Sequence, residues 1–176
     1  MSDNIRVGLI GYGYASKTFH APLIGGTPGM ALAAVSSSDA AKVHADWPSV
    51  PVVSEPKHLF NDPNIDLIVI PTPNDTHFPL AKAALEAGKH VVVDKPFTVT
   101  LSQARELDAL AKSLGRLLSV FHNRRWDSDF LTVKRLLSEG TLGRSSFLSR
   151  TLTAFARRYE TAGASRPVLA AVSGMI

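Results

Sequence analysis

Two glycines follow the first apolar run of the sequence at a spacing that suits a bound pyrophosphate. The segment GLIGYGYAS places Gly11 and Gly13 before the small residue Ser16. Gly11 permits a tight turn, and Gly13 lets the backbone approach phosphate oxygens without a Cβ in the way. A helix that begins here would point its free N–H groups at the phosphates. The alternative is that the glycines only make a turn. The position after a first strand favours dinucleotide binding, with Tyr14 and Ala15 as further predicted cofactor contacts.

The end of the second predicted strand bears on which dinucleotide would bind. A fold specific for NAD usually places Asp or Glu there, to bind the ribose 2′-hydroxyl. This strand instead ends in Ser36, Ser37 and Ser38, with Asp39 one place further on. Serine hydroxyls can hydrogen-bond a 2′-phosphate, which a carboxylate would repel. The serines therefore predict NADP(H) as the preferred cofactor. NAD(H) is the alternative if Asp39 reaches the ribose, although Asp39 can also merely cap the next helix.

A lysine follows three consecutive valines in the segment VVVDKP, which contains Asp94, Lys95 and Pro96. Ligands of an open parallel sheet bind at the carboxyl ends of its strands. An ammonium group at this position, beside a nicotinamide, could hold a substrate hydroxyl or polarise a carbonyl during hydride transfer. Lys95 is therefore the predicted catalytic residue, and Asp94, Lys95 and Pro96 are predicted cofactor contacts. The alternative is a structural ion pair between Lys95 and Asp94 or another carboxylate.

Two further segments place polar residues after predicted strands. In IVIPTPNDTHF the prolines hold the loop extended, and Asn74 or Asp75 can cap the next helix. His77 is either a site residue or a polar residue on the surface of that helix. In FHNRRWDSDF, an arginine could meet an oxygen of the cofactor or substrate, or belong to a solvated loop. The predicted cofactor contacts in these segments are Pro71, Thr72, Asn74, His77, Asn123 and Arg124.

Five short apolar runs predict the strands that would position these residues: IRVGLIG, MALAAVS, IDLIVIPT, KHVVVDKP and RLLSVFH. Such runs are typical of buried parallel strands. Helical periodicity covers residues 75–87 and 100–114, and a further helix is expected over about 127–138. Gly88 and Gly115 provide stops, and Thr100 with Gln103 forms a capping box. The alternation predicts an α/β fold, a Rossmann-type doubly wound parallel sheet.

The composition argues against several other classes of protein. The chain of 176 residues has a formal net charge of +4. Residues 144–176 contain five arginines and one glutamate, so they account for all of this charge and residues 1–143 are neutral overall. Residues 1–143 lack the excess of positive charge that is typical of proteins that bind nucleic acids. No apolar run is long enough to predict a membrane span or a signal peptide. The absence of cysteine is typical of a cytoplasmic protein. No metal site is predicted.

The segments VGLIGYGYAS, TPNDTH, DKP and FHNRRWD, in this order, resemble the Gfo/Idh/MocA oxidoreductase family, which includes glucose–fructose oxidoreductase and inositol dehydrogenase. The resemblance covers about residues 5–143. It implies an NAD(P)-binding Rossmann domain and hydride transfer to or from a sugar-like or polyol substrate. It makes Lys95 catalytic, with Asp94 in place of the common glutamate. Family members also have a second α/β domain, which supplies an acid–base histidine and much of the homo-oligomer interface. We expect that second domain to be missing here, and with it most of the interface.

The resemblance divides the sequence into three parts. Residues 1–121 are predicted as the Rossmann domain, 122–143 as a linker and helix, and 144–176 as an irregular tail unlike the family. A shifted reading frame is one interpretation of the tail. From position 149 a neighbouring frame can encode ESHFDRFRPALRDRWREQAGPGGGIWYD, which resembles the family's crossing into its second domain. The other interpretation is that residues 144–176 are a natural divergent tail. We expect an NAD(P)-dependent oxidoreductase with little or no turnover, or alternatively a non-catalytic dinucleotide-binding module that acts as a sensor or partner subunit.

Overall fold

A computed structural model describes residues 4–141 and 143 of the chain. The chain divides into two compact units, Met1–Asn123 and Arg124–Ile176. The prediction of an irregular or frame-shifted tail over 144–176 lies outside the described residues.

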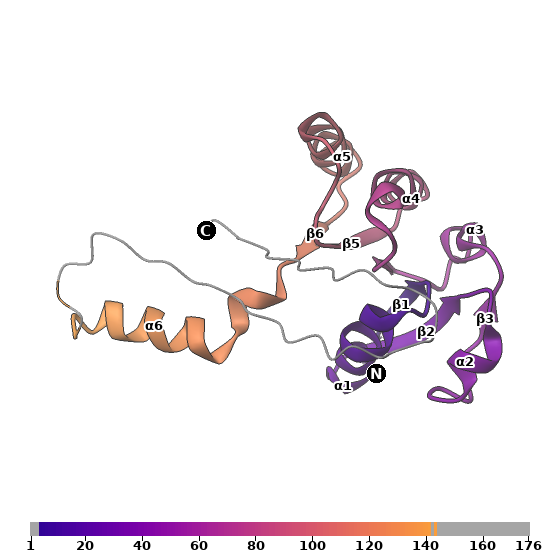
Figure 1. The fold of residues 1–176 in the computed structure, drawn as a ribbon. Coiled ribbons are helices and arrows are strands. Elements are labelled where there is room, and N and C mark those ends of the chain that lie inside the picture. Colours follow the sequence, from indigo (N-terminus) through magenta and orange to yellow (C-terminus); the bar gives the residue numbers. More distant parts are fainter. Residues whose placement is uncertain (1–3, 142, 144–176) are drawn as a thin grey trace, which may run out of the picture. The chain divides into compact units, whose positions relative to one another are not determined.

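The first unit contains a six-stranded parallel sheet with the strand order β3-β2-β1-β4-β5-β6 (Figure 1). Its strands are β1 (Ile5–Ile10), β2 (Met30–Ser36), β3 (Val52–Val53), β4 (Leu67–Ile70), β5 (His90–Asp94) and β6 (Leu118–Phe121). Its helices are the π-helical turn η1 (Ser16–His20), α1 (Ala21–Gly26), α2 (Ala40–His44), α3 (Pro56–Phe60), α4 (Asn74–Glu86) and α5 (Leu101–Ser113). This strand order is that of a doubly wound dinucleotide-binding sheet, which confirms the predicted fold class. Each of the five predicted runs forms a strand, and the two-residue strand β3 adds a sixth.

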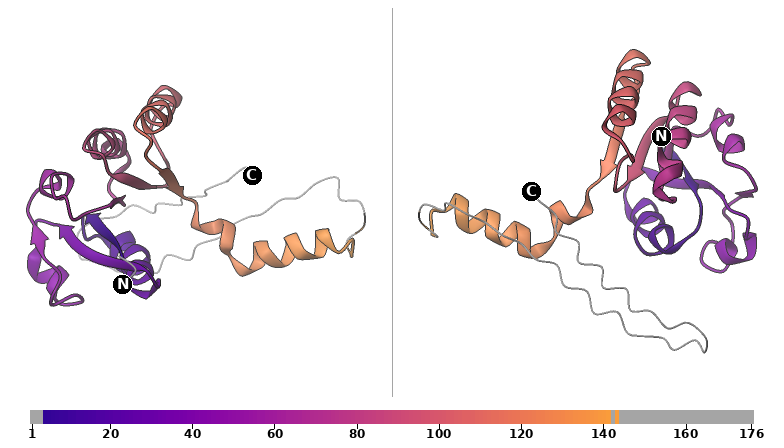
Figure 2. Two further views of the ribbon diagram at one scale, coloured as in Figure 1. Left: turned by 180° about the vertical axis from the view of Figure 1, so that it is seen from behind. Right: turned by 45° about the horizontal axis from the view of Figure 1, so that its top comes forward.

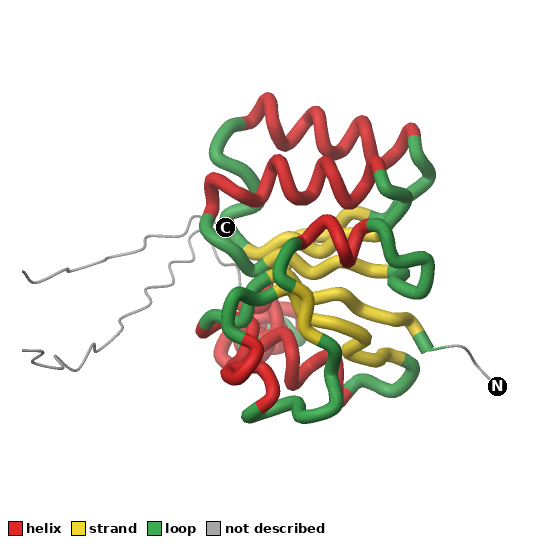
Figure 3. Tube along the Cα trace, turned by 90° about the vertical axis from the view of Figure 1, so that its right-hand side faces the viewer, coloured by secondary structure: helices red, strands yellow, loops and turns green. Residues whose placement is uncertain are grey.

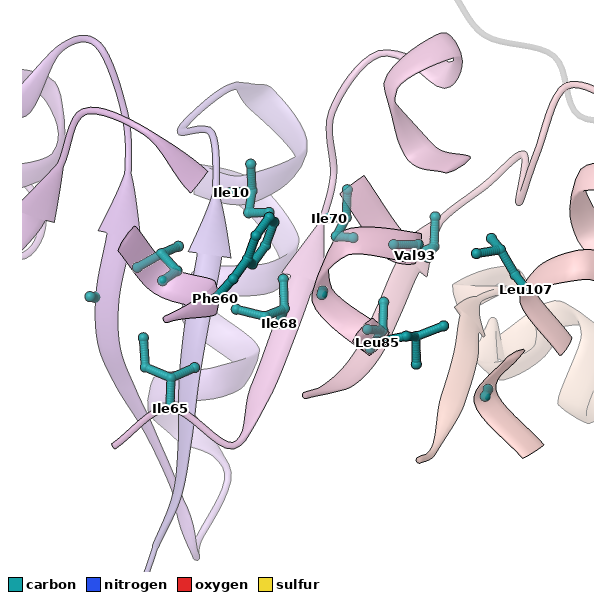
Figure 4. Packing of buried hydrophobic residues seen from close by; sticks show 14 residues of the cluster. Ile10, Phe60, Ile65, Ile68, Ile70, Leu85, Val93 and Leu107 are labelled. Carbon is teal, nitrogen blue, oxygen red and sulfur yellow. The ribbon is translucent and has the colours of Figure 1, made fainter. Parts of the chain in front are cut away.

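Helices cover both faces of this sheet, as Figure 3 shows, and each face has its own hydrophobic core. On one face α3, α4 and α5 pack against side chains such as Ile10, Ile68 and Val93 (Figure 4). On the other face α1 and α2 pack against Val7 and Leu9. Side chains alternate between the faces because successive residues of a strand point in opposite directions. The continuous apolar runs of the sequence therefore reflect strands that are covered on both sides.

The helix boundaries follow local sequence signals in most places. The Thr100 side chain accepts the N–H of Gln103, and the Gln103 side chain in turn accepts the N–H of Thr100, so the predicted capping box is present at the start of α5. Gly115 follows this helix with φ +62°, a conformation that glycine adopts readily. Both views in Figure 2 show α4 beside α5. The predicted capping of α4 by Asn74 or Asp75 is wrong. Pro73 takes the N-cap position, without a side-chain hydrogen bond.

Beyond β6 the chain forms the short 3-10 helix η2 (Asn123–Trp126) and then α6 (Ser128–Ser138). The helix α6 lies within a residue of its predicted bounds. In the second unit, an ion pair of 3.2 Å joins Arg124 Nη1 to the Asp127 carboxylate, whose Oδ2 accepts the hydrogen bond. Arg124, a predicted cofactor contact, therefore belongs to a different unit from the glycine turn, and its cofactor role stays a prediction.

Candidate active site at the carboxyl edge of the sheet

The parallel register brings the polar strand ends to one edge of the sheet. β1 lies between β2 and β4, which is the point where the strand order reverses. The Gly11 N–H donates to the Ser36 carbonyl oxygen at 2.7 Å. On the other side, a Cβ added to Gly11 would lie 3.7 Å from Thr72 Cγ2. The glycine turn therefore lies between the ends of β2 and β4, at the position where doubly wound sheets bind dinucleotides.

The two glycines of the turn are used in different ways. Gly11 has φ +79°, in the left-handed region that favours glycine. Gly13 is exposed, and no atom lies within 4 Å of the place where its Cβ would stand. Ser16 is fully buried and its hydroxyl donates to the Gly11 carbonyl oxygen at 2.9 Å, which closes the turn against η1. Gly11 shapes the turn, and the open space at Gly13 fits the approach of a phosphate group. Tyr14 is exposed, and Ala15 is half-buried at the start of η1.

Tyr12, between the two glycines, anchors the turn to the segment after α2. The side chain is buried, and its hydroxyl donates to Asp46 Oδ2 at 3.0 Å. Burial, followed by the neighbouring carboxylate, raises the pKa of Tyr12. Lys17 pairs with the same carboxylate at 2.8 Å, and the hydrogen bonds from Lys17 and Tyr12 lower the pKa of Asp46. Nothing in the sequence alone indicated Tyr12 as a support of the turn, because its partner lies 34 residues away.

The serines after β2 form the neighbouring strand end. Ser36 is buried, Ser37 is half-buried and Ser38 is exposed. The Asp39 carboxylate accepts the N–H of Lys42 at 3.0 Å and caps α2, which is the capping role left open by the sequence. The Ser37 hydroxyl accepts the Asp39 N–H at 3.1 Å. In this arrangement the carboxylate serves the helix, while hydroxyl groups occupy the strand end.

His77 is fully buried and joins the loops that follow β4 and β5. Its Nε2 lies 2.8 Å from the Thr72 carbonyl oxygen, and its Nδ1 lies 2.8 Å from the Pro96 carbonyl oxygen. A carbonyl oxygen only accepts, and the neutral imidazole ring carries a single N–H, so the neutral ring donates a hydrogen bond to one of these two oxygens. The interpretation of His77 as a polar surface residue is wrong. Its ring is also not exposed to a ligand, so we replace the predicted direct cofactor contact with a supporting role.

Lys95 is exposed directly after β5, whereas Asp94 is half-buried at the end of that strand. Asp94 Oδ1 accepts the Lys95 N–H at 2.8 Å, and Asp94 Oδ2 lies 3.7 Å from His20 Nε2. Within the described residues, no ion pair joins the Lys95 ammonium to Asp94 or to another carboxylate, so that alternative is not realised. Pro96 is exposed beyond a cis Lys95–Pro96 bond. This geometry leaves the ammonium group available to a ligand at the carboxyl edge.

The remaining predicted residues lie in the loops at this edge. Pro71 is half-buried immediately after β4, Asn74 is exposed in the first turn of α4, and Asn123 is half-buried two residues after β6. His20, which the sequence analysis did not single out, is buried beside Asp94. A search of the described residues finds no group of three His, Cys, Asp or Glu side chains that could hold a metal ion. None of the described helices is both long and apolar enough to cross a membrane.

A doubly wound sheet with a glycine turn at its first strand–helix junction defines a dinucleotide-binding domain of the Rossmann class. The family model described as an oxidoreductase family with an NAD-binding Rossmann fold matches residues 5–122. The chain therefore belongs to the Gfo/Idh/MocA family of oxidoreductases, as the motifs predicted.

Several relatives share this part of the chain. The uncharacterized oxidoreductase YdgJ of Escherichia coli is 87% identical over 147 residues, which are 84% of this chain and 42% of YdgJ. The scyllo-inositol 2-dehydrogenase (NADP(+)) IolW of Bacillus subtilis is 43% identical over 80% of this chain and 39% of its own length. The YPO2259 structure from Yersinia pestis has a TM-score of 0.81 and 70% identity, covering 91% of this chain and 47% of that one. The chain thus spans less than half the length of each of these relatives.

Proposed function

We propose that this chain belongs to an NAD(P)-dependent oxidoreductase that transfers hydride between the nicotinamide ring and a sugar-like or polyol substrate. The observation that carries the proposal is the placement of the glycine turn and Lys95 at one edge of one sheet, after β1 and β5, with β4 between those strands. The family supports the redox chemistry. The name of IolW, an inositol dehydrogenase, supports a polyol class of substrate.

The described residues have separate roles in this proposal. The backbone around Gly11 and Gly13 holds the pyrophosphate, and the loop at Pro71 and Thr72 lines the path toward the nicotinamide. The bound nicotinamide supplies the hydride chemistry. The Lys95 ammonium holds the reacting hydroxyl or carbonyl oxygen and exchanges a proton with it. Stabilising charge that develops on this oxygen is a large contribution to such reactions.

We further propose a preference for NADP(H) over NAD(H). The Asp39 carboxylate caps α2 and the Ser37 hydroxyl donates to the Asp39 carbonyl oxygen at 3.2 Å, while the exposed Ser38 presents a hydroxyl group after β2. Hydroxyl groups can donate to a 2′-phosphate, and the relative IolW is named for NADP(+). A Ser37→Asp variant should reverse the preference, because the new carboxylate repels the 2′-phosphate and accepts from a 2′-hydroxyl.

Turnover with polyols and aldoses, measured by nicotinamide absorbance alongside fluorescence titration of cofactor, tests the proposal. Where the wild-type protein turns over one of these substrates, the Lys95→Ala variant should lower turnover by about 10²-fold or more, in the range of lost general acid–base catalysis, while its affinity for NADPH changes little. Lys89→Ala is not a suitable control, because the buried Lys89 ammonium donates to two carbonyl oxygens and its loss would affect the fold. Lys57→Ala, on the exposed surface of α3, is the matched control and should retain wild-type turnover. An unchanged turnover in Lys95→Ala would refute the role of Lys95.

A dinucleotide-binding module without turnover is the second candidate. Two histidines that contact the Asp94–Pro96 segment, His20 and His77, are buried, with 4% and 0% of their surface exposed. Neither can exchange a proton with a substrate in this structure, so Lys95 has no exposed partner from that pair. Cofactor binding without turnover on any tested polyol or aldose would favour this candidate, whereas turnover would exclude it.

A further inference from the structure

His20 has an unsatisfied polar atom beside the segment that carries Lys95. The side chain is buried, and among the described residues its Nε2 has no hydrogen-bond partner. The Asp94 Oδ2 atom lies 3.7 Å away, which is too long for a hydrogen bond. Buried polar atoms of native proteins are nearly always bonded, and the exceptions call for an explanation.

The backbone that positions His20 is unusual as well. His20 is the last residue of η1, which is π-helical and begins directly after the glycine turn. Such turns are rare and occur frequently at functional sites. The ring of His20 packs on Phe121 of β6, with 4.3 Å between ring centroids. A side chain from the helix that would bind phosphate thus reaches the ends of β5 and β6.

Asp94 connects this ring to the catalytic candidate. Its Oδ2 faces His20, and its Oδ1 accepts the N–H of Lys95 at 2.8 Å. A shift of His20 toward Asp94 would therefore fix the orientation of the carboxylate, and with it the main chain of Lys95. Among the described residues, Asp94 on β5 is the charged group whose electrostatic effect reaches the His20 ring. Phe121 on β6 packs against the same ring and is uncharged.

We propose that His20 is a positioning residue that couples dinucleotide binding at the glycine turn to the orientation of Lys95. Phosphate contacts at the start of η1 draw the helix into place, and His20 Nε2 closes on Asp94 Oδ2 to form a hydrogen bond. The unmade bond of this structure is the one that the bound cofactor completes. This inference rests on the proposed cofactor binding, and it adds a residue that the family motifs did not mark.

A titration of the His20 ring by NMR, with and without saturating NADPH, tests the coupling. Burial lowers the pKa of His20, and Asp94 opposes this effect in part. A hydrogen bond to Asp94 favours the charged ring, so the pKa of His20 should rise when NADPH binds. The signal is assigned by its loss in His20→Phe, which keeps a buried ring against Phe121. The rise should be absent in Asp94→Asn.

Hydrogen exchange of the Lys95 amide gives a second test. If His20 had only a structural role, its loss would not change the exchange of this amide selectively. In the NADPH-bound state, His20→Phe should speed this exchange by about tenfold while the amides inside β5 stay near wild type. The control His58→Phe, on the exposed surface of α3, should change neither the titration of His20 nor the exchange of the Lys95 amide. If NADPH binds but leaves the His20 titration and the Lys95 exchange unchanged, the coupling is refuted and the proposed function stands. If NADPH does not bind, both are refuted.

Discussion

Replacing His77 by phenylalanine should destabilise the Rossmann unit strongly, although the ring is nearly the same size. The histidine lies 2.8 Å from the Thr72 carbonyl oxygen and 2.8 Å from that of Pro96, and its side chain is fully buried. Phenylalanine donates to neither oxygen. The neutral ring donates to one of these two oxygens, and a buried polar group that loses its partner costs about 1–3 kcal/mol. That loss is a large part of a typical domain stability of about 5–15 kcal/mol.

Urea unfolding measures this cost directly. Trp47 packs against the core that contains Val7 and Leu9, so its fluorescence reports on the Rossmann unit. A Trp126→Phe background removes the signal of the exposed Trp126 indole. In a separate thermal scan, the midpoint of unfolding should fall by roughly 2–12 °C, since about 2–4 °C corresponds to each kcal/mol. His77→Gln keeps an amide donor that can reach one carbonyl oxygen, so it should lose less stability than His77→Phe. The exposed control His58→Phe should lie within about 0.5 kcal/mol of wild type. A His77→Phe variant as stable as this control would refute the bridging role.

Three other changes have expected outcomes. Gly11→Ala should lose about 1–2 kcal/mol of unfolding free energy because φ +79° disfavours side chains; an unchanged urea midpoint would contradict this. Thr100→Ala removes the acceptor of the Gln103 N–H, so it should cost about 1 kcal/mol in the same assay, and a gain in stability would exclude the cap. Burial lowers the pKa of His20 from 6.5, so as the pH falls below 6.5 the unfolded chain takes up the proton first and stability declines. Urea titrations at several pH values should show a smaller decline in His20→Phe; an equal decline would refute this assignment.

The elements of the sheet could be predicted because their signals are local. Runs such as KHVVVDKP are apolar over a strand length, and Thr100 with Gln103 marks a helix start within four residues. The short strand β3 was not among the predicted runs, because two residues carry no periodicity. The start of α4 was misjudged because polar residues at Asn74 and Asp75 resemble caps, although Pro73 takes that position.

The supports of the candidate site could not be predicted, because they depend on contacts between distant segments. His77 meets Pro96 across 19 residues, and Tyr12 meets Asp46 across 34. One sequence gives the type of each residue but not which distant carbonyl or carboxylate it faces. The exposed Lys95 and the glycine turn could be identified because their chemistry depends on their own position at a strand end.

The measurement that tests the central claim most directly is NADPH binding to a Gly13→Val variant. No atom lies within 4 Å of the place where a Cβ of Gly13 would stand, and its φ lies outside the left-handed region, so the fold should tolerate the side chain. Gly26→Ala, a helical glycine with similarly open space, is the control. We predict that the wild-type protein and Gly26→Ala bind NADPH saturably. Gly13→Val should keep the wild-type urea midpoint of unfolding but should not bind NADPH. Equal NADPH affinity in all three proteins, or no binding in wild type, would contradict a dinucleotide site at the glycine turn.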